Sequence, residues 1–295
     1  MPFLELSTVT PAHAPDAIEN CFFGAGALTV TLADAADHPI LEPLPGTTPL
    51  WPTVRVTGLF DATSEADALI RAIQAGLLDD SVVIETRWVH DRVWEREWLK
   101  DFKPMRFGQN LWVCPGGQPP PETTQTQRIV WLDPGLAFGT GTHASTALCL
   151  TYLDRHPPMR CKVLDVGCGS GILTLASLKC GARWVHALDI DPQALIATEE
   201  NAKHNGVWAQ VHLTDATAPW DNDHELILAN ILAEPLIELA PRIATACAPN
   251  GQVVLAGLLD AQIDAVAAAY SPFFALAPAE LQAGWALLHG RRLSV

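Results

Sequence analysis

The chain has 295 residues, of which 49% are hydrophobic, and it carries a formal net charge of −15. This length can bury a sizeable core in more than one domain, and the acidic balance argues against a nucleic-acid partner, which needs a basic face. No apolar run approaches the roughly 20 residues of a membrane span, and the amino terminus has no secretion-signal pattern. The seven cysteines have no metal-ligand spacing, which indicates reduced thiols. We therefore expect a cytoplasmic protein without a metal site.

Alternating strands and helices are predicted in residues 1–89. The periodicity predicts strands over 3–9, 27–32, 53–59 and 82–89, and helices over 11–23 and 64–78. This β-α-β-β-α-β order is typical of a small α+β ferredoxin-like domain. The segment holds twelve acidic and three basic residues, so its formal charge is −9. Such acidity serves either solubility or the attraction of a basic protein.

Residues 90–127 are interpreted as a linker helix followed by a proline-rich connector. Trp94, Trp98 and Phe102 recur every four residues, which places three aromatic rings on one helical face. Basic residues beside them would also suit the stacking of RNA bases. Helical spacing favours the alternative, in which the rings pack against protein. The prolines and glycines of residues 115–121 mark a boundary.

Strands alternate with helices through residues 128–295. We expect strands over 129–132, 163–166, 185–188, 211–213, 226–229 and 253–256, with a terminal antiparallel pair over 273–277 and 285–288. The helices are expected after residue 142, up to residue 179, and over 192–205, 232–246 and 261–269. Such alternation predicts a parallel sheet covered by helices on both faces. Ligands of these sheets bind beyond the carboxyl ends of the strands.

A glycine-rich turn follows the second of these strands. Asp165, Gly167, Gly169 and Gly171 alternate with other residues before an apolar helix, so backbone amides at the helix start can face a ligand. Ile172 stands where a dinucleotide fingerprint needs a small residue, which weakens an NAD interpretation. A phosphate-binding P-loop is excluded because no Lys-Ser/Thr pair follows. The pattern resembles motif I of S-adenosylmethionine methyltransferases; a purely structural turn is the alternative.

Polar residues are also expected at the ends of the next three strands. Asp189 lies about twenty residues past the glycines, where a carboxylate accepts hydrogen bonds from ribose hydroxyls. Asp191 fits better as the cap of the helix at Pro192. Asp215 could meet an adenine amine or form a turn, and Asn230 ends the fourth strand.

Residues 133–146 combine small and flexible residues with the start of a helix. Thr140 or Thr142 would suffice as a helix cap, but a cap does not explain Gly135, Gly139 and Gly141. These glycines could instead serve as hinges of a lid over a cofactor.

Residues 133–146, the glycine turn, Asp189 with Asp191, and Asn230 with Leu232 together resemble the PrmA family, the methyltransferases of the large-subunit ribosomal protein L11. The resemblance spans residues 88–295, including 103–108, and is loose before them. It implies a ferredoxin-like substrate-recognition domain over 1–89, a connector over 90–127 and a seven-stranded Rossmann-like S-adenosylmethionine domain over 128–295. The implied cofactor contacts are Thr146, Gly167, Asp189 and Asn230, with Phe138, Gly139, Thr140 and His143 in the loop over the cofactor; Asp165, Gly169 and Asp215 complete the predicted site.

The chemistry expected here is methyl transfer to an amine. A sulfonium is already activated, so the protein must mainly align a deprotonated amine behind the methyl group. Desolvation and the nearby sulfonium charge both favour the neutral amine. We expect the Asn230 side-chain oxygen and the backbone carbonyls after it to hold the amine while water takes the proton. His143 as the base is the alternative.

Two other functions are the alternatives to this chemistry. Methyltransferases of glutamine amides or nucleobases commonly carry Asn-Pro-Pro-aromatic at this strand end, whereas Asn230 is followed by Ile-Leu-Ala, which disfavours a planar acceptor. A non-catalytic S-adenosylmethionine-binding factor would not need the glycines, Asp189, Asn230 and a lid together. The resemblance therefore implies a protein methyltransferase that modifies lysine side chains or the N-terminal amine of ribosomal protein L11. We expect the chain to be a monomer.

Overall fold

The computed structural model describes residues 2–11, 15–36, 49–77, 82–89, 103–121, 124, 126–133 and 141–294. The chain divides into two compact units, residues 1–94 and 95–295, and each is described by itself. Among the described residues, no helix is both long enough and apolar enough to cross a membrane.

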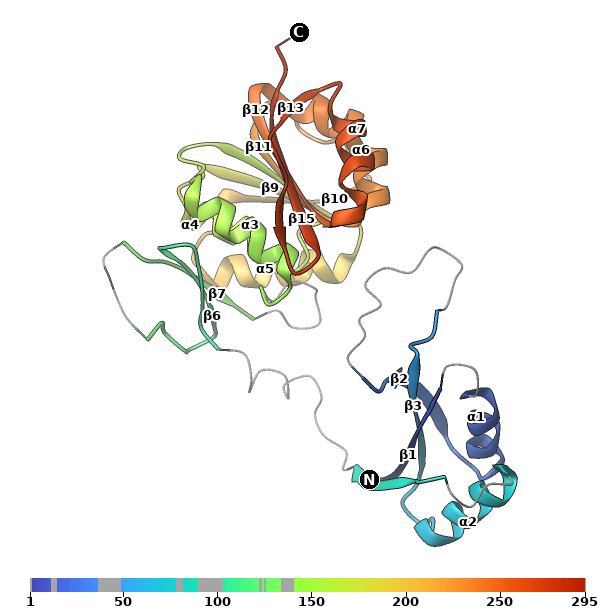
Figure 1. Ribbon diagram of the computed structural model, residues 1–295. Helices are drawn as coiled ribbons and strands as arrows, with labels where there is room; N and C mark the ends of the chain where they lie inside the picture. Colours follow the sequence, from blue (N-terminus) through green and yellow to red (C-terminus); the bar gives the residue numbers. More distant parts are fainter. Residues whose placement is uncertain are drawn as a thin grey trace. The chain divides into compact units, whose positions relative to one another are not determined.

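The first unit is an antiparallel sheet with two helices (Figure 1). Its elements are β1 (Phe3–Pro11), α1 (Pro15–Gly24), β2 (Thr29–Asp34), β3 (Thr53–Asp61), α2 (Ala66–Leu77) and β4 (Glu85–Val89). The strands lie in the order β2-β3-β1-β4, and every pair is antiparallel. Alternate residues of β1 and β3 bury Leu4, Leu6, Val54 and Val56 under the helices. The element order is the one that the sequence pattern predicts.

A small three-stranded sheet opens the described part of the second unit. It comprises β5 (Met105–Phe107), β6 (Leu111–Pro115) and β7 (Arg128–Leu132), with β6 parallel to β7. The turn between β5 and β6 is anchored because the Asp154 carboxylate accepts hydrogen bonds from the Gln109 and Asn110 amides at 2.6 and 3.2 Å.

This small sheet corrects the expectation that residues 90–127 serve only as a connector. The part over 103–121 is folded into the second unit, and β7 pairs with β6 instead of joining the large sheet. The aromatic face predicted at Trp94, Trp98 and Phe102 lies outside the described residues.

The large sheet has the strand order β10-β9-β8-β11-β12-β15-β13, with β14 paired to β15. Its parallel strands are β8 (Lys162–Val166), β9 (Trp184–Asp189), β10 (Val211–Asp215), β11 (His224–Asn230) and β12 (Cys247–Leu259). Its antiparallel strands are β13 (Phe274–Leu276), β14 (Glu280–Gln282) and β15 (Trp285–Arg292). The predicted parallel sheet and the predicted terminal antiparallel pair are both confirmed.

Helices cover both faces of this sheet (Figure 1). One core cluster joins the sheet to α3 (Ala144–Arg155), α4 (Ile172–Lys179), α5 (Pro192–His204) and the small sheet. The other joins it to α6 (Ala233–Ala246) and α7 (Ile263–Tyr270). The carboxyl ends of β8, β9, β10 and β11 therefore lie along the same side of the sheet, between two helical layers. Open α/β sheets bind their ligands at this side.

Candidate active site

The glycine-rich turn after β8 has a left-handed backbone. The φ angles of Gly167, Gly169 and Gly171 are 76°, 55° and 82°. Residues with a Cβ rarely adopt this backbone region. A Cβ on Gly167 would also lie only 2.4 Å from Cγ2 of Ile231. The amides of Gly167 and Cys168 donate to the Leu188 carbonyl at 2.8 and 3.1 Å, which fixes the turn against the end of β9. Glycine is therefore required here by conformation and by packing.

Asp189 ends β9 and receives hydrogen bonds from two backbone amides. Its Oδ2 accepts from the Gly169 amide at 2.9 Å and its Oδ1 from the Asp191 amide at 3.0 Å. A carboxylate offers about four lone pairs, so Asp189 keeps acceptor capacity for a ligand while it holds the glycine turn. Asp191 caps α5 by accepting from the Gln193 amide at 2.9 Å, and the predicted cap is confirmed.

Asp215 lies beside Asp189, because the two residues are register partners in the parallel pair β9–β10. Its Oδ1 accepts from the amide and the hydroxyl of Thr217 at 2.7 and 2.6 Å. These bonds lower the pKa of Asp215, the hydroxyl contributing most. The turn-forming role that the sequence left open is therefore observed, and the carboxylate is placed at the same edge as Asp189.

Asn230 and Thr146 meet across two elements. Thr146 is buried in the first turn of α3, and its hydroxyl accepts from Nδ2 of Asn230 at 3.2 Å. Asn230 is the last residue of β11, whose neighbour β8 leads directly into Gly167. Using Nδ2 for Thr146 leaves the Asn230 side-chain oxygen as an acceptor.

His143 is the N-cap of α3, a position for which Thr140 or Thr142 was expected to suffice. Its Nδ1 accepts from the Ser145 amide at 3.4 Å and lies 2.7 Å from the Ser145 hydroxyl. The ring packs edge-on against Trp285 with centroids 4.4 Å apart. Burial lowers the pKa of His143, so the imidazole is neutral near pH 7.

Asp165 differs from Asp189 and Asp215 because it is fully buried beneath the glycine turn. Its Oδ2 accepts from the Thr174 hydroxyl at 2.6 Å, while Oδ1 is buried without a hydrogen-bond partner. Burial raises its pKa to about 6; the Thr174 bond opposes this shift and the charge of Asp189 adds to it.

Phe138, Gly139 and Thr140 lie outside the described residues. Asp133 directly follows β7, and its amide and carbonyl both bond to the Asn201 side chain, at 3.0 and 2.9 Å. The same side chain donates to the carbonyl of Ser170 at 2.9 Å. Asn201 thus ties the glycine turn to the end of β7.

Sequence reasoning missed three residues that support the turn from beneath, namely Thr174, Thr198 and Asn201. The Thr198 hydroxyl donates to the Gly169 carbonyl at 3.0 Å and lies 3.3 Å from the Cys168 sulfur. All three are polar residues on buried helix faces. Polar residues on an otherwise apolar helical face were the available signal.

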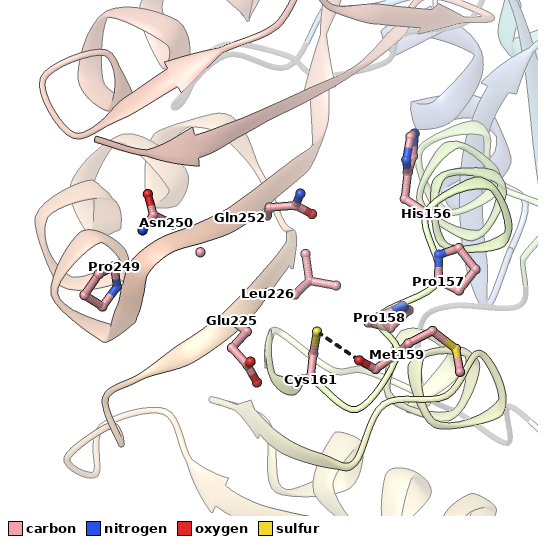
Figure 2. A pocket seen from close by; sticks show the side chains of 11 residues that line it. His156, Pro157, Pro158, Met159, Cys161, Glu225, Leu226, Pro249, Asn250 and Gln252 are labelled. Atoms are coloured by element: carbon pink, nitrogen blue, oxygen red, sulfur yellow. Dashed lines mark hydrogen bonds between the residues drawn. The ribbon is translucent and has the colours of Figure 1, made fainter. Parts of the chain in front are cut away.

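A cavity of about 440 Å³ lies at the amino-terminal end of the strands, away from the carboxyl ends that carry the glycine turn. Figure 2 shows its lining residues, which come from the segment before β8, the start of β11 and the start of β12. The Cys161 thiol there donates to the Met159 carbonyl, and burial raises its pKa. A thiol with a raised pKa is a poor nucleophile, so Cys161 is not an evident catalytic group.

Comparison with known proteins identifies the family. The model of the family "Ribosomal protein L11 methyltransferase (PrmA)" matches residues 2–293. The chain belongs to this family. A ribosomal protein L11 methyltransferase of Hahella chejuensis is 45% identical over 293 residues, covering 99% of each chain. One from Methylococcus capsulatus is 46% identical over 280 residues, covering 93% of this chain and 94% of the relative.

A solved structure is also similar. The crystal structure of a ribosomal protein L11 methylase from Lactobacillus delbrueckii subsp. bulgaricus is 34% identical, with a TM-score of 0.60 over 65% of this chain and 99% of that chain. The predicted resemblance, the methyltransferase class, the S-adenosylmethionine cofactor and the Rossmann-like fold are thereby confirmed. The PrmA match also extends over the first 87 residues, where the motifs alone give only a loose resemblance.

Proposed function

We propose that this PrmA-family chain transfers methyl groups from S-adenosylmethionine to amino groups of ribosomal protein L11, at lysine side chains or at the N-terminal amine. The observation that carries the proposal is the meeting of the glycine turn, Asp189, Asp215 and Asn230 at one sheet edge. The relatives' names supply the substrate. We propose the cytoplasm as the location of the reaction, because the proposed substrate is a ribosomal protein, and a monomer as the form of the enzyme.

The residues at this edge fit the cofactor by their chemistry. Left-handed Gly167 and Gly169 expose backbone where side chains would obstruct a ligand. Asp189 would accept from the ribose hydroxyls, and Asp215 would accept from the adenine amine. Thr146, behind Asn230, would complete the wall on the α3 side. Phe138, Gly139 and Thr140 are proposed for the loop over the cofactor.

The cofactor supplies an electrophilic methyl group, and the protein supplies alignment. The incoming amine must be neutral, although its unperturbed pKa is about 10.4. Desolvation at the helix-covered edge favours the neutral form. The Asn230 side-chain oxygen and the backbone carbonyls after it would accept the amine N–H groups and orient its lone pair, and water would take the proton.

The two remaining predicted residues have positioning roles in this proposal. Asp165 holds Thr174 beneath the glycine turn without reaching the surface. The Nδ1 of His143 is committed to capping α3. A capping role explains the geometry of His143 more directly than that of a base.

The acidic first unit is the proposed docking surface for the substrate. Two of the three basic residues in 1–89 are paired, Arg55 with Glu85 and Arg87 with Glu5, both at 3.0 Å. The other acidic side chains leave the unit strongly negative, which attracts a basic ribosomal protein. Salt should therefore raise KM for the protein substrate more than KM for S-adenosylmethionine.

The proposed function is tested by incubating the full chain with labelled S-adenosylmethionine, ribosomal proteins and ribosomal RNA. Label is expected in ribosomal protein L11, and mass spectrometry of that protein identifies the modified amines. Label in RNA would overturn the proposed acceptor. The absence of label despite binding of the cofactor would indicate a non-catalytic binding protein.

The role of Asn230 has a separate test. Asn230→Ala removes the proposed amine acceptor, and misplacement of the amine is expected to lower kcat about a hundredfold. Thr146→Val serves as the comparison because it removes only the hydroxyl that accepts from Asn230. Normal turnover by Asn230→Ala, with retained affinity for S-adenosylmethionine, would contradict the orienting role.

A further inference from the structure

Three potential metal ligands meet at the amino-terminal end of the large sheet. His186 in β9 and His212 in β10 are register partners with rings stacked at 4.7 Å between centroids. Asp221 lies in the segment before β11, with Oδ2 4.0 Å from Nδ1 of each histidine. The three ligand atoms all lie within 4.8 Å of one another. The sequence could not show this group, because its members are separated by 26 and 9 residues and have no motif spacing.

His186 has an unsatisfied nitrogen that points to a ligand. The residue is 0% exposed, and its Nδ1 is buried with no hydrogen-bond partner. Its Nε2 lies 2.7 Å from the hydroxyl of Thr214. Buried polar atoms are normally satisfied, and a metal-bound histidine typically donates its second ring N–H to an oxygen. Both features fit Nδ1 as a ligand atom, with Thr214 fixing the tautomer.

A neighbouring histidine repeats this feature. Nδ1 of His224 lies 3.2 Å from the Ala246 carbonyl, so it carries the proton. Its Nε2 is then a bare lone pair, and it is buried without a partner. The His224 ring centroid is 5.8 Å from that of His186. His224 is not a member of the ligand group, but its unpartnered nitrogen shows that hydrogen-bond donors are also lacking beside the His186 ring.

We propose that Nδ1 of His186, Nδ1 of His212 and the Asp221 carboxylate bind a divalent transition-metal ion, with Zn²⁺ as the preferred ion. Two imidazoles and a carboxylate are ligands typical of zinc, and water would supply the fourth ligand. Ligand atoms around tetrahedral zinc lie about 3.3 Å apart. The two observed 4.0 Å separations between the carboxylate and the rings therefore need a closing movement, which Asp221 can make because its side chain is 49% exposed. The two rings are stacked in the absence of the ion, so His212, which is also 49% exposed, must turn its imidazole to direct Nδ1 at the same ion.

The charges around the group allow this binding. Lys162 is the competing cation, with Nζ 3.9 Å from Asp221 Oδ2. Its Nζ also donates to the Asn222 carbonyl at 2.9 Å and lies over the Trp184 ring, so it has other partners when the ion binds. A cavity of about 460 Å³, lined by Lys162, Arg183, Trp184 and Asp221, opens beside the group and offers an entry path.

The ion would have a structural role. It would join β9, β10 and the segment before β11 at the end of the sheet away from the glycine turn. Binding is therefore independent of the proposed methyl transfer and can be measured without a substrate.

The test uses the full chain freed of metal with a chelator and titrated at pH 7 with Co²⁺, followed by competition with Zn²⁺. Visible absorption should show a single Co²⁺ in nitrogen and oxygen ligands, displaced by Zn²⁺. His212→Gln and Asp221→Asn should weaken binding by more than about 100-fold. Thr214→Val should weaken it by about tenfold, because it removes the hydroxyl that holds Nε2 of His186. His204→Gln and Asp223→Asn remove a similar exposed group outside the cluster and should bind normally.

Three results would overturn the proposal. They are no binding of either ion by the wild-type chain, unchanged affinity in His212→Gln, and thiolate-to-cobalt absorption that reports cysteine ligands. His212 and Asp221 have half-exposed side chains, so their variants should fold, and a melting curve of each metal-free variant checks this. Unchanged melting together with lost ion binding assigns the ligands directly.

Discussion

The two ends of the large parallel sheet treat polar groups in opposite ways. At the carboxyl ends, Asp189, Asp215 and Asn201 use their side chains to hold backbone amides and carbonyls. At the amino ends, His186 and His224 each leave a buried ring nitrogen without a partner. The backbone of the glycine turn is held in place before any ligand arrives, although Oδ1 of Asp165 beneath it has no hydrogen-bond partner. At the amino ends the unpartnered atoms are ring nitrogens that can bind a ligand directly.

This difference indicates two ways of building a binding site. A loop that meets its ligand through its own backbone must be rigid beforehand, so side chains below it are used for support. A site that meets its ligand through side chains keeps those atoms unpaired until the ligand binds. The carboxyl end therefore suits a large, uncharged nucleoside surface, and the amino end suits a small cation.

The largest effect is expected from Gly167→Ala, which disrupts the backbone conformation of the glycine turn. A residue with a Cβ is strained at the left-handed φ of 76°, and its Cβ would lie 2.4 Å from the Ile231 side chain. Binding of S-adenosylmethionine, measured by calorimetry, should be lost. Gly206→Ala is the matched control, because Gly206 has a φ of 68° and nothing within 4 Å of the added Cβ. Equal loss in both variants would mean that backbone strain alone is responsible.

The buried acid beneath the turn should give the next largest effect. The pKa of Asp165 rises from 3.8 when unfolded to about 6 when folded. Between these values the folded state holds a proton that the unfolded state releases, so the free energy of unfolding falls as pH rises. The fall amounts to about 3 kcal/mol and is complete above pH 6.

Urea unfolding between pH 4 and 7 measures this fall. Asp165→Asn should lack it, because the amide does not titrate. Thr174→Val removes the hydrogen bond that lowers the pKa of Asp165. In this variant the decrease in the free energy of unfolding should therefore extend to higher pH. The same pH dependence in wild type and Asp165→Asn would show that another group is responsible.

A smaller effect is expected from Asn201→Ala, which cuts the tie between the glycine turn and β7. Three hydrogen bonds of a buried amide are lost, at a cost of about 2 kcal/mol in unfolding free energy. Asn205→Ala is a matched comparison, since Asn205 bonds in the same way to the amide and carbonyl of Trp131 but not to the glycine turn. Both should lose stability, and only Asn201→Ala should weaken cofactor binding, by roughly tenfold.

The carboxyl-end site could be predicted from sequence because its elements are local. A strand, a glycine turn and a helix are contiguous, and Asp189 and Asn230 fall at strand ends where an α/β sheet must place them together. The supporting residues could not be found this way. Thr174, Thr198 and Asn201 act through bonds to backbone atoms that only the packed fold brings near.

The misplaced small sheet has a similar cause. Residues 105–107 and 111–115 are short, and β6 pairs with β7 across a proline-rich segment, so local composition indicated a connector. Likewise, His186 and His212 become neighbours only through the register of β9 with β10. Long-range pairing, more than local propensity, decides these features.

The smallest expected effect tests whether the two ends are independent. His186 and Asp189 are three residues apart in β9, a separation of about 10 Å along the strand. This is comparable to the screening length of about 8 Å in physiological salt, and Asp221 is itself half exposed. Asp221→Asn should therefore leave the affinity for S-adenosylmethionine, measured by calorimetry, within about a factor of two while metal binding is lost. A larger loss of cofactor affinity would show that β9 and β10 transmit changes between their ends, and the two edges would then have to be treated as one coupled site.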